Sequence, residues 1–393
     1  MINWIKIRKR YEDELLKNVI PFWEKYSPDF EYGGFFTCLD RNGTIFDTEK
    51  FMWMQWRIVY MFSELFLSKF SNKRFLELAL NGADFLIKYG KDSENRYYFS
   101  LNRKGVPTVC AYNIYTECFA GMACASLYKA TGEMKFYNES LSCVKKYIER
   151  MNNPKGKWEK SLEGKKHYLS LGHYMMLANL GYVVKTRLND NSFDNKIDET
   201  VSFVIDNFVE PSNGILLENI CDEKNNRFDF ESSLGRHINP GHGLEALWFF
   251  LQWLELKKNL SLIKRVSELI ISTLNFAWDR KYGGIFYFMD ILNKPHFELT
   301  WDMKLWWVHC EAIVATLYGF VITQNKLFLK WFKIIDRWTW KHFPDKKYPE
   351  WFGYLNRKGE PTHMLKGGKW KTFFHLPRML SVSLSLIDRI LKL

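Results

Sequence analysis

Hydrophobic residues along this 393-residue chain follow two alternating helical patterns. One pattern is amphipathic, as in "RFLELALNGADFLIKYG" (residues 74–90), where apolar residues recur every three or four positions. The other is apolar on nearly every side, as in "ECFAGMACASLYKA" from residue 117 and "LEALWFFLQWLEL" from residue 244. A helix that is hydrophobic all round is expected to be buried all round. The pattern therefore predicts outer helices that alternate with inner ones.

A repeat of about sixty residues accompanies this alternation. Inner helices are expected at residues 50–71, 113–131, 168–188, 242–258, 302–323 and 371–390, each after an amphipathic helix, the first of which begins near residue 7. Hairpin-like segments with turn residues start at residues 31, 95, 155, 213, 282 and 350, and two of them, "SLNRKGVPT" and "YLNRKGEPT", are nearly identical. We therefore predict an all-α fold, an (α/α)6 barrel with short β-hairpins at the active-site end, as a single domain over residues 1–393.

Composition narrows the class of protein. A hydrophobic content of 47% excludes a disordered chain, and residues such as Gln252 and Glu255 interrupt the apolar runs, so no membrane span is expected. The N-terminus has no long apolar segment followed by a small-residue cleavage site. We expect a cytoplasmic protein without a membrane partner.

Cysteines and charge suggest neither metal nor nucleic acid. The seven cysteines are scattered, without a CxxC pair, which is typical of reduced core residues. The net charge of +12 is spread over the whole chain, so we interpret it as a solvated surface and expect no nucleic acid partner. No three-ligand metal spacing, GxGxxG, Walker loop or GxSxG motif occurs.

Ionisable residues interrupt the apolar helices near their predicted starts. They are Arg57, Glu117, His173, His242, Glu245, Lys304, His309, Glu311, His375 and Arg378. A buried ionisable group is costly unless it is paired or used. Because all six inner helices are expected to begin at the hairpin end of the barrel, these side chains predict one pocket at that end.

Two of the histidines lie at helix starts. Pro240 and Gly241 precede His242, and Pro377 follows His375. The positive end of a helix dipole disfavours imidazolium, so we expect both rings to be neutral and to form a general acid/base pair. Glu245 lies three residues after His242, close enough to orient its ring or to bind a hydroxyl group.

The other histidines favour structural interpretations when each is taken alone. His173 and His309 lie in aromatic surroundings that are typical of hydrogen-bonded core residues. The remaining candidates are interpreted as loop or surface residues: His237, His296, His342 and His363.

Several motifs resemble the N-acylglucosamine 2-epimerase family, whose animal members were also called renin-binding proteins. They include "GGFFTCLDRNG", "KFMWMQWRIVYMFSELF", "NPGHGLEALWFF", "YGGIFYFMD", "MKLWWVHCEA", "EWFGYLNRKGE" and "KGGKWKTFFHLPRML", and together they extend from about residue 31 to 380. The resemblance implies an (α/α)6 barrel that interconverts N-acetylglucosamine and N-acetylmannosamine, a precursor of sialic acid. It implies that His242 and His375 are catalytic, and that Arg57, Glu245 and Glu311 bind substrate. Trp307, His309 and His173 complete the expected substrate-binding set.

The implied reaction is removal and return of the C2 proton of an open-chain amino sugar, with one histidine on each face of a planar intermediate. It requires no redox cofactor or metal. The resemblance also allows ATP as an activator that does not react, and a homodimer. The chain departs from the family pattern at Trp56, where a small residue is common, and at Val308, where proline is usual. These two departures leave the identity of the sugar substrate undecided.

Three other functions remain open on the sequence. The first is an epimerase or isomerase of an unsubstituted sugar, of the mannose isomerase or cellobiose 2-epimerase type. The second is a glycoside hydrolase, which needs two opposed carboxylates, and Glu117, Glu245 and Glu311 are available for that role. The third is a non-catalytic sugar- or protein-binding module.

Overall fold

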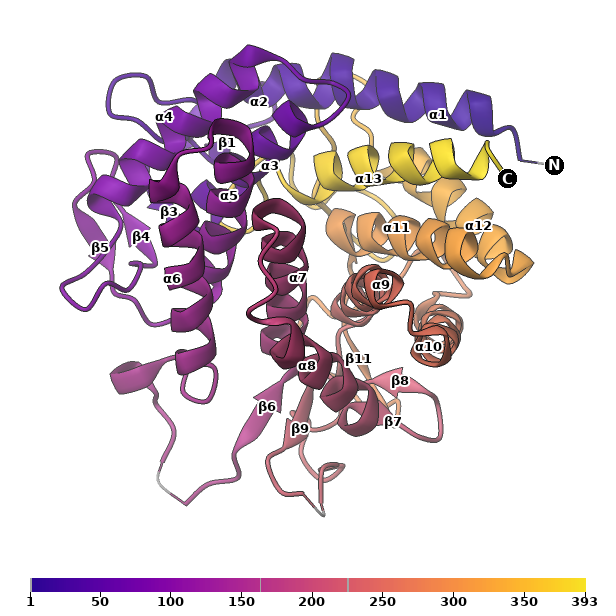
Figure 1. The fold of residues 1–393 in the computed structure, drawn as a ribbon. Helices are drawn as coiled ribbons and strands as arrows, with labels where there is room; N and C mark the ends of the chain where they lie inside the picture. The colour runs from indigo at the N-terminus through magenta and orange to yellow at the C-terminus, as the bar shows by residue number, and fades with distance from the viewer. Residues whose placement is uncertain (1, 163, 225) are drawn as a thin grey trace.

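The computed structural model describes residues 2–162, 164–224 and 226–393, and within them the helices form two concentric layers (Figure 1). The inner layer consists of α3 (Met52–Leu67), α5 (Tyr115–Thr131), α7 (Leu171–Leu188), α9 (Pro240–Lys257), α11 (Trp306–Thr323) and α13 (His375–Ile390). The outer layer consists of the continuous segment α1 (Trp4–Asp13), η1 (Glu14–Val19) and α2 (Ile20–Tyr26), then α4 (Lys73–Tyr89), α6 (Met134–Arg150), α8 (Asp194–Asn207), α10 (Leu260–Ala277) and α12 (Lys326–His342). The predicted (α/α)6 barrel is confirmed.

The inner helices close into a ring. Each packs against the next in chain order from α3 to α13, and α13 contacts α3 again. Figure 1 shows α1 alongside α13, with both ends of the chain on the same side of the barrel. The first outer helix therefore lies against the last inner one, as a barrel assembled in chain order requires.

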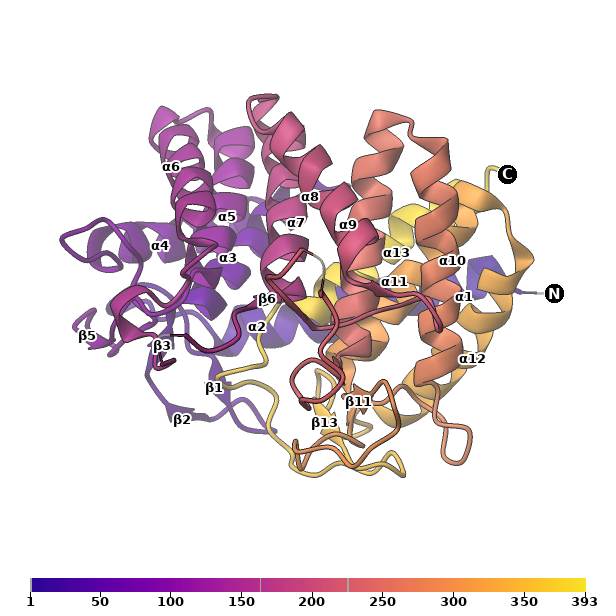
Figure 2. The same cartoon turned by 90° about the horizontal axis from the view of Figure 1, so that it is seen from below.

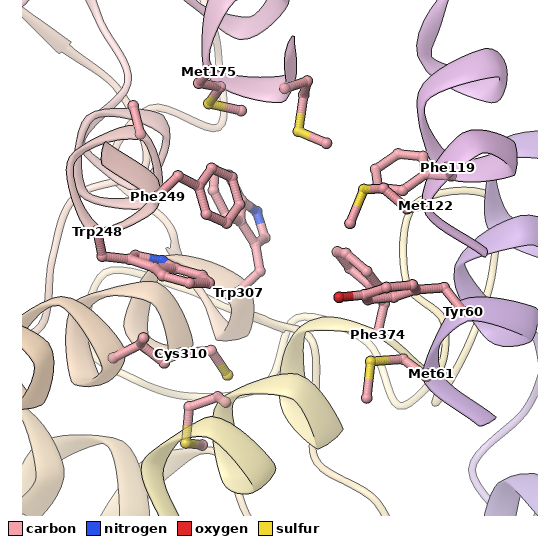
Figure 3. Packing of buried hydrophobic residues seen from close by; sticks show 14 of the residues in the cluster. Tyr60, Met61, Phe119, Met122, Met175, Trp248, Phe249, Trp307, Cys310 and Phe374 are labelled. Atoms are coloured by element: carbon pink, nitrogen blue, oxygen red, sulfur yellow. The ribbon is translucent and has the colours of Figure 1, made fainter. Parts of the chain in front are cut away.

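Large apolar side chains fill much of the barrel interior. Figure 3 shows Trp248, Phe249 and Trp307 on one side of the centre, opposite Phe119 and other side chains from α3, α5 and the start of α13. The buried apolar residues form a continuous cluster from α1 to α13. Every described inner helix therefore contributes to the same core.

Helix α11 corrects the expectation that no apolar stretch is long enough to cross a membrane. Its 18 residues meet that criterion by length and composition, with a mean hydropathy of 1.3. However, 83% of the segment is buried within the protein, where α9, α12 and α13 pack around it. Its hydrophobicity is that of an inner helix of the barrel.

Short strands gather at one end of the barrel (Figure 2). They are β1 (Cys38–Leu39), β2 (Ile45–Asp47), β3 (Lys50–Phe51), β4 (Ser100–Leu101), β5 (Pro107–Val109), β6 (Tyr168–Ser170), β7 (Val209–Glu210), β8 (Ile215–Leu216), β9 (Asn219–Cys221), β10 (His237–Ile238), β11 (Met289–Asp290), β12 (Lys304–Leu305) and β13 (Tyr354–Leu355). The hairpins β1–β2 and β4–β5 form as predicted. The hairpin β7–β8 instead turns at residues 211–214, where the predicted fourth segment begins, and β9 within that segment pairs with β6.

The sixth predicted hairpin also forms, since Leu355 bridges Pro361 across the second Asn-Arg-Lys-Gly turn. The prediction of a separate hairpin in each repeat is wrong for the fourth and fifth segments. The third segment contains a 3₁₀ turn, η2 (Gly156–Trp158), and Glu163 within it lies outside the described residues. Other strands pair across repeats, in the pairs β3–β4, β6–β9, β10–β11 and β12–β13, each joining the residues before an inner helix to the next repeat. The pairing partner is therefore a neighbouring repeat, which local sequence does not reveal.

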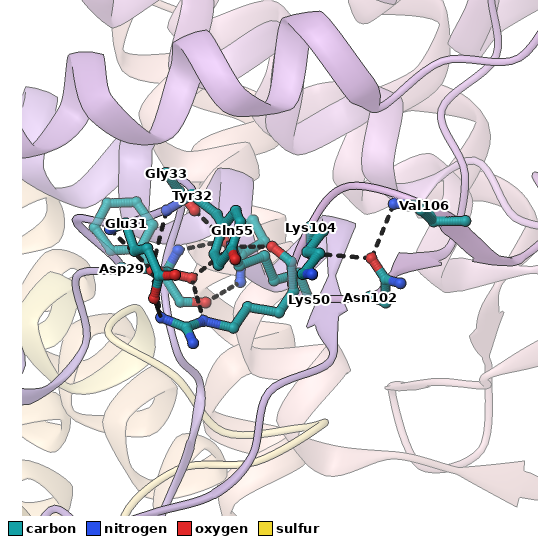
Figure 4. Close-up of polar contacts among 11 residues, drawn as sticks. Asp29, Glu31, Tyr32, Gly33, Lys50, Gln55, Asn102, Lys104 and Val106 are labelled. Carbon is teal, nitrogen blue, oxygen red and sulfur yellow. Dashed lines mark hydrogen bonds and ion pairs between the residues drawn. The ribbon is translucent and has the colours of Figure 1, made fainter.

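The duplicated Asn-Arg-Lys-Gly turns have a structural purpose. Arg103, from the first copy, donates two hydrogen bonds to Asp29 at 3.0 and 3.1 Å, and Lys50 donates to the same carboxylate at 3.0 Å (Figure 4). Arg357, from the second copy, donates to Asp279 at 2.9 Å. Each turn thus connects its own repeat to the loop that follows the outer helix of the preceding repeat.

Candidate active site

A cavity of about 750 Å³ opens at the strand end of the barrel. The N-terminal portions of all six inner helices contribute to its wall, as the sequence predicts. Of the predicted site residues, these line the cavity: Arg57, His242, Glu245, Trp307 and His375. Its size falls within the range that ligand-binding pockets of proteins commonly have.

His242 lies in the first turn of α9, where the Asn239 side chain caps the helix by accepting its backbone N–H at 3.2 Å. Its Nδ1 lies 2.9 Å from a carboxylate oxygen of Glu218, so Nδ1–H donates to Glu218 and Nε2 is left for chemistry. Burial alone would lower the pKa of His242, but the Glu218 carboxylate outweighs burial and raises it. The pKa of His242 is thus shifted in the direction opposite to the one expected from the helix start, because that expectation neglected a carboxylate from another segment.

His375 begins α13 and has the opposite electrostatic environment. Its Nδ1 donates to Glu311 Oε1 at 2.7 Å, and its Nε2 lies 3.5 Å from Arg57 Nη1. Burial and the Arg57 guanidinium hold the pKa of His375 well below its ordinary value, so the ring is neutral, as expected. The cavity thus contains one histidine that favours its proton and one that does not.

Arg57 lies beside the reactive nitrogen of His375. Its guanidinium group is surrounded by the rings of Trp53, Phe119 and Phe374, with 4.2–4.5 Å to the ring centroids. Burial lowers its pKa to about 9, so the group remains charged at neutral pH. It forms no ion pair with a carboxylate among the described residues, which leaves it available for an anionic oxygen.

A buried arginine lies behind His375 and the carboxylate that binds it. Arg378 Nη2 donates to both Glu245 and Glu311, and Glu311 Oε2 also accepts the indole N–H of Trp248 at 2.8 Å. Glu245, Glu311 and His375 are close enough together to hold a metal ion, with candidate ligand atoms within 4.8 Å of one another. Arg378 already pairs with both carboxylates and so offsets part of their combined negative charge.

Other predicted residues lie outside the cavity wall. Glu311 holds His375 from behind, and His309 is fully buried, with Nδ1 on the Leu305 carbonyl at 2.8 Å and Nε2 accepting the Ile285 N–H at 3.0 Å. His173 packs against Tyr115, with 5.6 Å between the ring centroids. His309 and His173 are therefore not placed to bind substrate, which corrects that expectation.

Two further ionisable residues pair elsewhere. Glu117 pairs with Arg150, and Lys304 pairs with Asp279. Both belong to the packing around the barrel end. Neither Trp56 nor Val308 is among the residues that line the cavity, although both depart from the family pattern.

The sequence interpretation missed Glu218, which orients His242. Glu218 lies between β8 and β9, 24 residues before its partner, and no spacing rule links it to the helix. It also misplaced His237 and His363, which it assigned to loops or the surface, because both line the cavity. Only the folding of the hairpin end over the helix starts brings these residues to the site.

Comparison with known proteins agrees with this geometry. The sequence model of the family described as N-acylglucosamine 2-epimerase matches residues 34–378. The chain belongs to this family. It is 34% identical to the N-acylglucosamine 2-epimerase of Mus musculus over 98% of this chain and 93% of that protein. It is 26% identical to the cellobiose 2-epimerase of Dictyoglomus turgidum over 95% of this chain and 97% of that protein.

A solved structure supports the fold assignment. The cellobiose 2-epimerase of Spirochaeta thermophila superimposes with a TM-score of 0.85 at 20% identity, over 99% of this chain and 98% of that one. The predicted membership of the family is confirmed. An enzyme of the sugar epimerase class follows from the family and from the histidine pair in the cavity.

Proposed function

We propose that this protein interconverts N-acetylglucosamine and N-acetylmannosamine by moving the proton at C2. The observation that carries the proposal is the pair His242 and His375, whose rings both pack against Trp307 in the cavity wall, with 5.4 and 5.6 Å between centroids, and whose pKa values are shifted in opposite directions. Greater identity to the N-acylglucosamine enzyme than to the cellobiose enzyme supports the amino sugar as substrate.

The chemistry needs a base on one face of C2 and an acid on the other. Neutral His375 can accept the C2 proton of the open-chain sugar through Nε2, while His242, held by Glu218, can return a proton to the opposite face. The aldehyde oxygen O1 becomes anionic as the C2 proton leaves. Arg57, next to His375 Nε2, supplies the charge that stabilises this oxygen.

The acylamino group determines the outcome of the reaction. A nitrogen at C2 prevents the simple shift of the carbonyl group from C1 to C2, so the planar intermediate can only regain a proton at C2. After one turnover His375 is charged and His242 is neutral, so both protonation states must be reset before the next one. Solvent exchange restores the starting pair, and the reverse reaction uses the same residues in exchanged roles.

A glycoside hydrolase fits the cavity less well. That reaction requires two free carboxylates across the scissile bond. Among the described residues, Glu245 and Glu311 both pair with Arg378, Glu117 pairs with Arg150, and Glu218 holds His242. The carboxylates near the cavity are therefore committed to other partners.

The decisive experiment is proton NMR of the protein with N-acetylmannosamine in D2O. We expect N-acetylglucosamine to appear with deuterium at C2. His242→Asn and His375→Asn should each abolish epimerisation, and each variant should still exchange the C2 proton of one epimer, because the remaining histidine faces one side of C2. Absence of exchange in the native protein would reject the proposal and leave unsubstituted sugars or a binding module.

ATP and a second copy of the chain are further proposed partners. No cofactor takes part in the proposed proton transfer. Repeating the NMR experiment with ATP tests activation, and sedimentation of the native protein tests a homodimer. An unchanged rate with ATP, or a monomer over the working concentration range, would refute the respective suggestion.

A further inference from the structure

A histidine pair outside the proposed catalytic set stands at the cavity wall. His237, on β10, lines the cavity, and its Nδ1 lies 2.9 Å from Nε2 of His296. His296 Nδ1 accepts the backbone N–H of Glu298 at 3.0 Å. Neither ring belongs to the predicted site, and the proposed proton transfer uses neither.

This chain of hydrogen bonds fixes where the protons are. A backbone N–H always donates, so His296 Nδ1 carries no proton and its Nε2–H donates to His237 Nδ1. The proton of His237 is therefore on Nε2. Burial lowers the pKa of both rings, which agrees with two neutral imidazoles. No described residue hydrogen-bonds to His237 Nε2, so this N–H is a free, neutral donor at the cavity wall.

His237 is also close to the catalytic pair. Its carbonyl oxygen accepts the backbone N–H of Glu218 at 2.9 Å, and the Glu218 carboxylate holds His242. The ring stands next to Phe288, with 4.8 Å between centroids, and Phe288 stacks on Tyr287 at 3.6 Å. The region beside His242 is therefore an aromatic corner into which His237 presents a fixed N–H.

We propose that this corner binds the acyl group of the substrate, with His237 Nε2–H donating to the acyl carbonyl oxygen and with Phe288 and Tyr287 packing against the methyl group. The inference rests on the proposed function. The acyl group is attached to C2, the atom that His242 serves, so it must lie close to that ring. A neutral donor suits the acyl oxygen, which stays neutral throughout, whereas the oxygen that becomes anionic is assigned to Arg57.

The test compares two open-chain inhibitors, 2-acetamido-2-deoxyglucitol and glucitol, which differ in the acylamino group. In His237→Leu we expect the inhibition constant of the acetamido compound to rise about tenfold, the loss of one hydrogen bond to a buried donor, while that of glucitol changes less than twofold. The KM for N-acetylmannosamine should rise by a similar factor with little change in kcat. His237→Gln keeps an N–H donor and should recover part of the loss.

Two further variants sharpen the test. His296→Ala removes the hydrogen bond that fixes the His237 tautomer, so it should cause a smaller loss of the preference for the acetamido inhibitor over glucitol. His167→Leu, at an exposed site, should leave that preference unchanged. Equal losses for both inhibitors, or no loss in His237→Leu, would overturn the inference. Absence of N-acetylmannosamine turnover in the native protein would instead overturn the proposed function, so the two failures are distinguishable.

Discussion

Each of the two cavity histidines, His242 and His375, has its own carboxylate partner, yet their pKa values shift in opposite directions. Both use Nδ1 to donate to a glutamate, Glu218 for His242 and Glu311 for His375. The difference arises from the arginines: Arg378 also donates to Glu311, and Arg57 faces His375 Nε2. The negative charge that favours an imidazolium is therefore compensated at one ring and uncompensated at the other.

Replacement of Glu218 should shift the pH dependence of catalysis. Because Glu218 raises the pKa of His242, kcat/KM should fall on the alkaline side as His242 loses its proton. In Glu218→Gln that limb should move to lower pH by about one unit or more. The measurement is kcat/KM from pH 5 to 10, with Glu223→Gln, exposed in the same connection, as the control. An unmoved alkaline limb would show that Glu218 does not set the proton affinity of His242.

At the scale of elements, small residues set the distance between the two layers. Gly319 on α11 faces the ring of Phe328 on α12, and a Cβ atom there would lie 2.5 Å from two ring carbons. Gly243 on α9 has much more room, since a Cβ would come within 3.8 Å of Thr273 and meet nothing closer. Glycine is therefore required for close helix packing at position 319, whereas position 243 has room for a side chain.

The two glycines should respond oppositely to alanine. Gly319→Ala should lower the free energy of unfolding by about 1–3 kcal/mol, because the buried Phe328 ring has to shift. Gly243→Ala should raise it by about 0.5–1 kcal/mol, because alanine favours the helix. Urea unfolding followed by circular dichroism measures both values. A loss of stability in both variants would refute the assignment of free space around Gly243.

At the scale of the whole molecule, buried ion pairs connect successive repeats and close the ring. Arg41 in the first hairpin donates to Asp345, after the last outer helix, at 2.7 and 2.8 Å, as Arg103 does to Asp29. Buried lysines complete the sets, with Lys50 on Asp29 and Lys366 on Asp345. The hairpin end that carries the site is thus held by charge pairing between repeats.

Acid should weaken this arrangement in a defined pH range. Although burial opposes it, Arg357 and Lys304 lower the pKa of Asp279 to about 2, against about 3.9 for an unfolded chain. The ionised Asp279 carboxylate therefore stabilises the fold above about pH 4, and this stabilisation is lost as the pH falls toward 2. Denaturant unfolding across this range should show the decline.

Asp279→Asn tests the origin of that decline. The variant should lose about 3 kcal/mol or more at neutral pH, because Lys304 is left buried without its partner. It should also show a shallower decline below pH 4. Asp84→Asn, at an exposed carboxylate on α4, is the matched control. An equally steep acid decline in both variants would contradict the role of Asp279.

The sequence by itself determined the helical barrel and part of the site. Hydrophobic periodicity is a local property, so it gave the inner and outer helices to within a few residues and located the helix starts at which His242, His375 and Arg57 lie. A helix start positions its first turn whatever its neighbours are. These residues could therefore be identified from short segments.

The tertiary structure decided the partners of these residues. Glu218 reaches His242 from a different segment. Both ring nitrogens of His309 are hydrogen-bonded to backbone groups. His237 lies in the cavity wall on β10, which pairs with β11 of the next repeat. Pairing between residues far apart along the chain follows from packing, and packing leaves no local period in the sequence. The proton affinity of each histidine depends on such pairs, so it could not be obtained from the helix start alone.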